Sequence, residues 1–155
     1  MANSGFSAHD HASCVDHALA NALGACAAAG LNLTPVRRRV LEILLESHAA
    51  LGAYDILARL NAEGLGSKPP VVYRALGFLV DHGFAHRVEL LNAFVACAHP
   101  GADHAPALMI CRTCKTVAEA VAPRPLQGAA RAAGFAIEQT VLEAEGLCPA
   151  CQDPA

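Results

Sequence analysis

Two Cys-x-x-Cys pairs restrict how the second half of this 155-residue chain can fold. Cys111 and Cys114 form the first pair, and Cys148 and Cys151 form the second, with 33 residues between the pairs. Two thiolates on one tight turn hold one side of a tetrahedral zinc ion, and a second such turn closes a four-sulfur site. A thioredoxin-like dithiol would need a βαβ context, which the sequence lacks here. The spacing therefore predicts one closed, structural zinc site, with a strand and a helix between its two halves.

The composition is typical of a folded protein from a reducing compartment. Apolar residues make up 54% of the chain and charged residues 16%, which excludes a disordered chain. Seven cysteines, beside eight histidines, indicate metal ligands rather than disulfides. No apolar run approaches the roughly 20 residues that span a bilayer, and no basic residue precedes the first apolar stretch as in a secretory signal. We expect a cytoplasmic protein with no membrane partner.

The first half of the chain reads as helices followed by a short hairpin. A helix is expected from about residue 13 to 29, and the Thr-Pro dipeptide at 34–35 supplies an N-cap and a first helical residue for the next one. Further helices are expected at 53–62 and at 69–82, and then two strands around a turn at 91–92. Three helices and a hairpin form a winged helix in this order, although the pattern alone fits another small helical domain equally well.

The second half changes character at about residue 98. Residues 98–106 are rich in small and helix-breaking residues, and we interpret them as a hinge loop. Strands are expected at 108–111 and 117–121, a helix at 125–133, and a final strand from 135 to about 143. The expected fold class is therefore α+β.

A second group of metal-binding residue types comprises His86, Cys97, His104 and Glu119. One thiolate, two imidazoles and one carboxylate form a suitable tetrahedral zinc set. Spacing alone leaves the ordinary alternatives open: Cys97 as a small buried apolar residue, the histidines as surface residues, and Glu119 as a solvated charge.

A third cluster lies near the N-terminus and comprises His9, His11, Cys14 and His17. Its close spacing suits an accessory metal site. Chain termini also carry such residues without a function, and this alternative stays open.

Six segments between Leu33 and Cys151 occur together in one order: LTPVRRRVLEIL, AYDILARL, KPPVVYRALGFL, HRVELLNAFVAC, ICRTC and GLCPAC. In this order and spacing they resemble the ferric-uptake-regulator superfamily. The segments AYDIL, PPVVYRALGFL and NAFVAC are most similar to its zinc-regulator branch. The resemblance implies a homodimer with two domains in each chain. Residues 1–97 would form a winged-helix DNA-binding domain, with 1–12 mobile; residues 98–106 would form the hinge, and 107–155 a small αβ dimerisation domain that holds the Cys-x-x-Cys zinc site.

The resemblance also gives the second group a role. Zinc regulators hold their sensory zinc with a His after the recognition helix, a Cys at the end of the wing, a loop His, and a Glu after the first Cys-x-x-Cys. His86, Cys97, His104 and Glu119 occupy those positions, with His99 as second choice for the loop His. Iron regulators carry His-His-Asp-His where this chain has CAHPGADH, and the Cys97 thiolate favours zinc. The resemblance thus implies two zinc ions per subunit, one structural and one regulatory, with the N-terminal cluster as a candidate for a third.

DNA contacts must come from a local arrangement, because the net charge is −3 and residues 1–90 hold seven basic and eight acidic side chains. The resemblance places Arg74 on the recognition helix, where a guanidinium can reach a guanine, and Tyr54 beside the groove. The candidates for phosphate contacts are Arg37, Arg38, Arg39 and Lys68. The alternative for the arginine run is a solvated helix face.

Two residues depart from the family pattern. Val71 stands where the family usually has Thr, which removes a hydroxyl at the start of the recognition helix. Gly77 stands where the family usually has an acidic residue, and a glycine inside a helix costs roughly 1 kcal/mol. Both bear on the affinity for DNA and not on the DNA-binding role.

The resemblance implies a zinc-responsive transcriptional repressor that binds operator DNA as a zinc-loaded homodimer and regulates zinc uptake genes. The alternative is a superfamily member that senses iron, manganese, nickel or peroxide. An enzyme is not expected, because a zinc hydrolase needs an open zinc position and a general base, whereas both predicted sites have four protein ligands. No small organic substrate is expected either.

Overall fold

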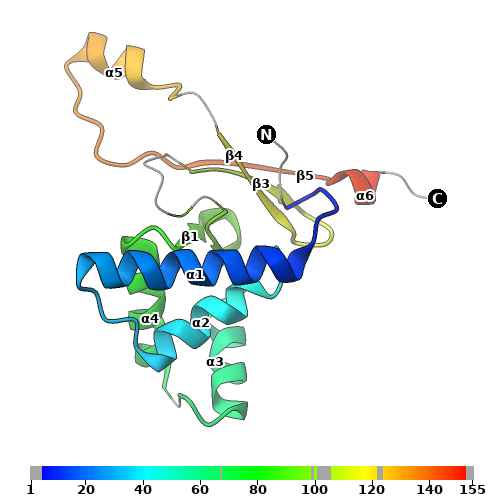
Figure 1. The fold of residues 1–155 in the computed structure, drawn as a ribbon. Coiled ribbons are helices and arrows are strands. Elements are labelled where there is room, and N and C mark those ends of the chain that lie inside the picture. The colour runs from blue at the N-terminus through cyan, green and yellow to red at the C-terminus, as the bar shows by residue number, and fades with distance from the viewer. Residues whose placement is uncertain (1–4, 67, 99, 101–105, 122–123, 153–155) are drawn as a thin grey trace.

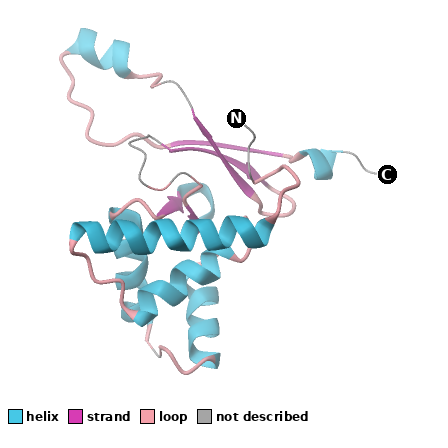
Figure 2. Ribbon diagram, in the orientation of Figure 1, coloured by secondary structure: helices cyan, strands magenta, loops and turns pink. Residues whose placement is uncertain are grey.

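The computed structural model of the chain describes residues 5–66, 68–98, 100, 106–121 and 124–152. Within those residues the N-terminal part is helical and the C-terminal part is built around a small sheet (Figures 1 and 2). None of the described helices combines the length and the apolar character needed to cross a membrane.

The N-terminal part consists of helices followed by a hairpin. Its elements are α1 (His11–Ala29), α2 (Pro35–Leu45), α3 (Ala53–Ala62), α4 (Pro69–Asp81), β1 (Ala85–Val88) and β2 (Ala93–Ala96). Helix α2 begins where the sequence predicts, because the Thr34 side chain accepts a hydrogen bond from the Arg37 amide at 3.3 Å and Pro35 occupies the first helical position. The predicted bounds of α3 are also confirmed.

Helices α2, α3 and α4 enclose the main core. They meet through side chains that are almost fully buried: Val40, Ile43, Leu44, Ile56, Leu60, Val72, Leu76 and Leu79. Helix α1 lies across this group (Figure 1) and adds Ala22 and Cys26. Each large buried side chain contributes roughly 1.5–3 kcal/mol. The core therefore holds α4 in place, with Tyr73 and Arg74 on its exposed face.

Strands β1 and β2 form the predicted hairpin. They pair antiparallel, from Ala85 opposite Ala96 to Val88 opposite Ala93. A short 3-10 helix, Glu89–Leu91, connects them and was not predicted. The helices and this hairpin together confirm the winged-helix order expected from the sequence.

The C-terminal part is a three-stranded sheet in the order β4-β3-β5. The central strand β3 (Pro106–Cys111) pairs antiparallel with β4 (Val117–Val121) and parallel with β5 (Leu142–Gly146). Helix α5 (Gln127–Ala133) lies apart from the helical part (Figure 1), and α6 (Pro149–Gln152) ends the described chain. The α+β fold class is confirmed.

The predicted final strand, 135–143, is wrong in position. Strand β5 begins only at Leu142, because its register starts with Leu142 opposite Ala107, near the beginning of β3. The residues before Leu142 lie beyond this pairing, and Phe135 is 67% exposed. Helix α6 was not predicted either.

One short segment, residues 48–51, connects the two parts. Leu51 exchanges two backbone hydrogen bonds with Phe94 of β2, at 2.8 and 2.9 Å. On the other side, the His48 carbonyl accepts from the amide of Val117 at 2.8 Å, and the Ala50 amide donates to the carbonyl of Lys115 at 3.1 Å. The wing and the sheet therefore both hydrogen-bond to this segment. The predicted hinge falls largely on residues 99 and 101–105, which lie outside the described residues.

Candidate metal centres and DNA-binding face

The four Cys-x-x-Cys thiols come together as predicted. Cys111 ends β3, Cys114 lies in the turn after it, and Cys148 and Cys151 lie at α6. Their Sγ atoms all lie within 4.8 Å of one another, and those of Cys114 and Cys148 are 3.7 Å apart. The parallel pairing of β5 with β3, which ends with Gly146 opposite Cys111, brings the second pair to the first.

Neighbouring hydrogen-bond donors favour the thiolate forms of Cys111 and Cys114. The backbone amides of Cys114 and Cys148 donate to the Cys111 sulfur and lower the pKa of Cys111 to about 6. The hydroxyl and amide of Thr116 lower the pKa of Cys114. Hydrogen bonds to Cys148 and Cys111 raise the pKa of Cys151 to about 12. Four sulfurs, some stabilised as thiolates by backbone N–H groups, fit the tetrahedral zinc ion predicted from the spacing.

The second predicted group joins the wing to the sheet. His86 lies on β1, Cys97 directly follows β2, and Glu119 lies on β4. The His86 Nε2 atom is 3.2 Å from Glu119 Oε2, and the Cys97 Sγ is 3.9 Å from Glu119 Oε1. The amide of Ala98 donates to Glu119 Oε2 at 2.9 Å. The two remaining candidates, His99 and His104, lie outside the described residues.

Burial excludes the surface interpretation for His86 and the solvated interpretation for Glu119, whereas the burial of Cys97 also fits its ordinary alternative, a small buried residue. The side chain of Glu119 is 5% exposed and that of His86 is 12% exposed, and Cys97 is 4% exposed. Burial of a carboxylate is costly unless a cation or hydrogen bonds compensate its charge. The sulfur, nitrogen and oxygen ligands that meet here form a donor set that zinc accepts.

The N-terminal cluster contains a residue that the sequence did not indicate. His9, His11 and Cys14 are brought together with His48, which follows α2, and their ligand atoms lie within 4.8 Å of one another. His17 lies exposed on α1 and is not in this group. Burial, and then the nearby His11 and His9, lower the pKa of His48. A single histidine after a helix carries no spacing signal, so only the fold reveals it.

The residues predicted to meet DNA bases or grooves are exposed. Tyr54, at the start of α3, is 69% exposed. Arg74 projects from α4, and its Nε donates to the carbonyl of Pro70 at 3.3 Å. Lys68 immediately precedes α4 and is exposed as well.

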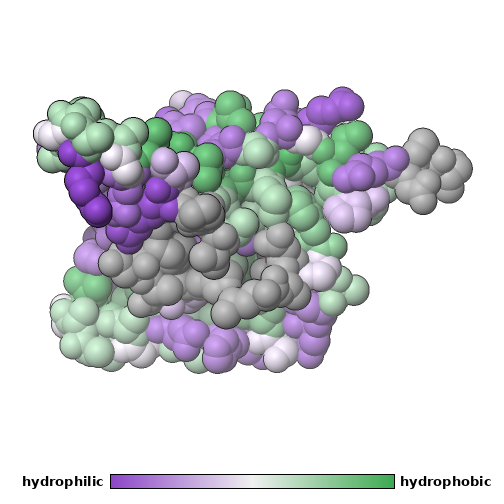
Figure 3. Space-filling view, turned by 90° about the horizontal axis from the view of Figure 1, so that it is seen from above, coloured by the Kyte–Doolittle hydropathy of each residue, from purple (hydrophilic) through white to green (hydrophobic). Residues whose placement is uncertain are grey.

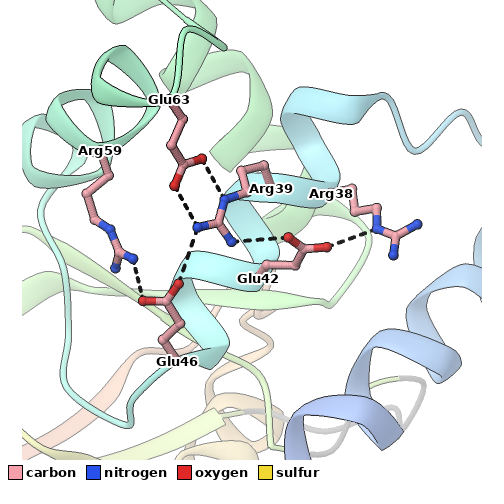
Figure 4. A network of polar contacts seen from close by, with 6 residues as sticks. All are labelled: Arg38, Arg39, Glu42, Glu46, Arg59 and Glu63. Carbon is pink, nitrogen blue, oxygen red and sulfur yellow. Dashed lines mark hydrogen bonds and ion pairs between the residues drawn. The ribbon is translucent and has the colours of Figure 1, made fainter.

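The three consecutive arginines of α2 have different surroundings. Arg39 donates two hydrogen bonds of 2.7 Å to Glu63 after α3, and further bonds to Glu42 and Glu46 (Figure 4). The hydrogen bond to Glu63, and then the other carboxylates, raise the pKa of Arg39 above its ordinary value. Arg39 therefore ties α2 to α3 and does not have a solvated side chain.

Arg37 and Arg38 make fewer polar contacts than Arg39. Arg37 donates to the carbonyl of Asn32 at 2.7 Å, and its guanidinium lies 4.0 Å from the centre of the Phe78 ring on α4. Arg38 is half exposed and pairs with Glu42 of its own helix at 3.0 Å. Such a pair between exposed groups stabilises the fold by little, so Arg38 can change partner.

Comparison with known proteins identifies close relatives. The zinc uptake regulation protein of Escherichia coli (strain K12) is 40% identical over 137 residues, which cover 86% of this chain and 80% of the relative. A zinc uptake regulator solved in complex with zinc and DNA is 39% identical, with a TM-score of 0.84; the match covers 89% of this chain and 95% of that one.

A further relative has been solved in two forms. Holo XcZur is 37% identical, with a TM-score of 0.78 and coverage of 86% of this chain and 96% of the other. Apo XcZur has the same identity but a TM-score of 0.53, with coverage of 91% and 99%. The ferric uptake regulator family model matches residues 28–144. By this match and by its identity to the relatives, the chain belongs to the ferric uptake regulator family.

Proposed function

We propose that this protein is a zinc-responsive transcriptional repressor, which binds operator DNA as a zinc-loaded homodimer and regulates zinc uptake genes. The observation that carries the proposal is the group of His86, Cys97 and Glu119, which draws ligands from both the wing and the C-terminal sheet. Relatives at about 40% identity are named zinc uptake regulators, and one was solved with zinc and DNA.

Each subunit would hold two zinc ions in this role. The four cysteines would hold a structural ion that stabilises the C-terminal part, since a closed four-sulfur site leaves no position open. His86, Cys97 and Glu119 would hold the regulatory ion, with His104 as the fourth ligand. Bound there, zinc would supply a positive charge that balances the buried Glu119 carboxylate and the Cys97 thiolate, and these residues with His86 would hold it in place.

The regulatory response would follow from the positions of the ligands. His86 belongs to β1 and Cys97 directly follows β2, so both are part of the wing or its edge, whereas Glu119 belongs to β4 of the sheet. Ligation of one ion by both sides would restrict the angle between the two parts. In a dimer this angle sets the separation of the two α4 helices, which must match two half-sites on DNA. Zinc would then raise the affinity for DNA by selecting one arrangement from a wider ensemble.

The two forms of XcZur support such a rearrangement. Both have the same identity to this chain, yet the TM-scores are 0.78 for the holo form and 0.53 for the apo form. Since sequence identity is equal, the difference lies in conformation. The arrangement of this chain is the one that resembles the holo form.

The C-terminal part offers a surface for a second copy. Leu126, Phe135 and Val141 are each more than half exposed. Helix α5 has no buried residue among those described, and β5 lies at one side of the described sheet. Figure 3, which views this end of the molecule, shows hydrophobic areas between hydrophilic ones. Large exposed apolar side chains of this kind are typical of protein interfaces.

The DNA-binding face would be formed by α4 and its surroundings. Arg74 would contact a base edge in the major groove, and Tyr54 would lie beside the groove. Lys68, Arg37 and Arg38 would contact phosphates. Arg39 would not contact DNA, because its guanidinium already donates hydrogen bonds to the carboxylates of Glu63, Glu42 and Glu46.

A mobility-shift titration tests the proposal. The probe is a zinc-transporter promoter at fixed salt, and zinc is varied for the wild type, Cys97→Ser and His86→Ala. His82→Ala, which changes an exposed histidine at the end of α4, is the matched control. We expect the wild type and the control to gain affinity with zinc and the two ligand variants to lose this response while they retain their fold and structural zinc. An unchanged response of both ligand variants would contradict the proposed mechanism.

The same assay separates zinc from the alternative signals. Iron, manganese and nickel ions and peroxide are each titrated against the metal-depleted wild type. A response to zinc at the lowest free concentration is expected, because Cys97 supplies a thiolate to the site. A stronger response to iron or to peroxide would assign the protein to another branch of the family.

A further inference from the structure

We propose that His9, His11, Cys14 and His48 form a third metal site, which binds Zn²⁺ and fastens the N-terminal arm, residues 5–10, to the segment that connects the two parts of the chain. The site is separate from both sites of the proposed function and does not depend on them. It takes three residues from the arm and the first turn of α1, and a fourth from beyond α2.

The four side chains already converge. Their ligand atoms all lie within 4.8 Å of one another. The Nε2 atoms of His9 and His48 face each other at 3.1 Å. The ring centres are 4.9 Å apart for His9 and His48, 5.1 Å for His11 and His48, and 5.6 Å for His9 and His11. Side chains that surround one zinc ion must approach one another in this way.

Two backbone carbonyls fix which ring nitrogens can bind a metal. His9 Nδ1 lies 2.9 Å from the carbonyl oxygen of Ser7, and His11 Nε2 lies 2.8 Å from that of Glu46. A carbonyl oxygen can only accept, so both of these nitrogens carry the proton. In the neutral rings the lone pairs are then on His9 Nε2 and His11 Nδ1. Histidine ligands of metals are usually oriented by a second hydrogen bond of this kind.

The donor set selects the class of metal. Three imidazoles and one thiolate suit a borderline divalent ion with four-coordinate geometry, and zinc is the common one. Four protein ligands leave no position for a substrate, so the site would hold structure together and would not catalyse a reaction. Among the described residues no carboxylate belongs to this group, which disfavours magnesium and calcium.

The location gives the site a mechanical consequence. The carbonyl of His48 accepts from the amide of Val117, at the start of β4. The arm also lies against this point, since a Cβ on Gly5 would collide with the backbone of Val117. A metal bound to His9 and His48 would therefore hold the arm at the junction of the helical part and the sheet.

A cavity gives solvent a path to the site. Its volume is about 440 Å³, and its lining includes His11, Cys14 and His48. Cys97 of the proposed regulatory group lines the same cavity. A metal at the third site would thus be able to exchange with solvent and would lie beside the regulatory group.

Metal stoichiometry tests the site in the full-length chain. Each variant is first treated with a chelator that leaves the four-cysteine zinc in place, and zinc is then titrated and counted by elemental analysis. We expect His48→Ala and Cys14→Ser to bind one equivalent fewer than the wild type. His17→Ala, which removes an exposed histidine from the same helix, should bind as much as the wild type. Equal stoichiometry in all four proteins would overturn the proposal.

Cobalt distinguishes this site from the regulatory one. In Cys97→Ser the regulatory group has no thiolate, the four Cys-x-x-Cys thiols keep their zinc, and Cys26 is buried in the helical core. A sulfur-to-cobalt charge-transfer band in the chelator-treated protein is therefore expected from Cys14. We expect this band in Cys97→Ser and its loss in the Cys97→Ser, Cys14→Ser double variant. Absence of the band in Cys97→Ser would reject the third site whatever the result for DNA binding. Conversely, if DNA binding does not respond to zinc, the proposed function fails, but the cobalt band from Cys14 is still expected.

The tether is tested by hydrogen exchange in the arm. Zinc should slow exchange of the amides of residues 5–10 in the wild type and in His17→Ala, but not in His48→Ala. If zinc protects the arm equally in His48→Ala, the metal does not link the arm to the junction, and this part of the proposal fails.

Discussion

The Nε2 atom of His86 lies 3.2 Å from Oε2 of Glu119, although the wing and the sheet that carry them are separated along the chain. The contact is buried, and the Ala98 amide donates to the same carboxylate. The carboxylate therefore occupies the point where both parts of the molecule meet. In the proposed regulatory site it is also the one ligand that the sheet supplies.

Glu119→Gln should weaken zinc binding at this site. The substitution keeps the shape of the side chain but removes the charge that balances the cation. We expect the zinc affinity of the proposed regulatory site to fall by more than about tenfold, since even groups that only orient ligands have effects of that size. Competition with a chromophoric chelator measures it, and Glu138→Gln, at an exposed position, serves as control. Equal affinities of the two variants would exclude Glu119 as a ligand.

Glu143→Gln should destabilise the contact between β5 and the wing. Its carboxylate accepts from the amides of Glu89 and Leu90 at 2.6 and 2.8 Å. An amide side chain has one acceptor oxygen and would point its NH₂ group at one of these donors. We expect the unfolding free energy to fall by about 1–3 kcal/mol, measured by thermal unfolding. Glu145→Gln, on the same strand but exposed, should change little, and a similar fall in that variant would argue against a specific role for Glu143.

The ion pair between Arg39 and Glu63 should make the unfolding free energy depend on pH in the acidic range. Arg39 lowers the pKa of Glu63 in the folded state. A lowered pKa stabilises the fold above the ordinary Glu pKa, and this contribution disappears as the pH falls through the folded value. The difference in unfolding free energy between wild type and Glu63→Gln should therefore be largest at neutral pH and shrink below about pH 4. Urea unfolding between about pH 7 and pH 3.5 measures it; a constant difference would contradict the assignment.

Gly77→Ala should stabilise the protein. Gly77 lies inside α4, and a Cβ there would meet nothing within 4 Å. Alanine should raise the unfolding free energy by about 0.5–1 kcal/mol. Gly83→Ala is the opposite case, because Gly83 follows the helix with φ of 78°, and an L-residue in that conformation costs about 1–2 kcal/mol. Thermal unfolding should move the two melting temperatures in opposite directions, and a drop for Gly77→Ala would mean that its backbone freedom is required.

Arg74→Ala and Lys68→Ala should weaken DNA binding in different ways. Without the Arg74 guanidinium at a base edge, operator binding should weaken by about 1–3 kcal/mol and the preference for the operator sequence should relax. Without the Lys68 ammonium at a phosphate, binding to all sequences should weaken, and the slope of log affinity against log salt should fall by about one. Titrations on operator and random DNA at several salt concentrations measure both effects. An equal weakening on both DNAs for Arg74→Ala would show that Arg74 does not read a base.

Elements with local signals were predictable from the sequence. The Thr34 cap and Pro35 mark the start of α2, and the apolar spacing of 53–62 gives α3. Strand β5 was misplaced because its start depends on the register of β3, which no local pattern contains. The 3-10 helix Glu89–Leu91 also has no local sequence signal, because its position depends on how β1 and β2 pair.

The metal-binding groups likewise differ in whether a local sequence pattern predicts them. Spacing alone indicated the four cysteines, because each pair lies on one turn. His86 lies on β1, Cys97 follows β2 and Glu119 lies on β4, so only the family resemblance indicated that they belong together. His48 had neither signal, since folding alone brings it to the N-terminal cluster. The position of His104 stays a prediction.

Helix α5 has seven residues and no buried side chain among those described, and a helix this short is not stable in water by itself. In the proposed dimer the second copy would bury one face of this helix, so that the folding of α5 would depend on the protein concentration. At low copy number a fraction of the chains would be monomers with a frayed end that is open to proteolysis. The turnover of the protein would then rise as its abundance falls, and the transcriptional output would depend on how much regulator the cell keeps as well as on its zinc.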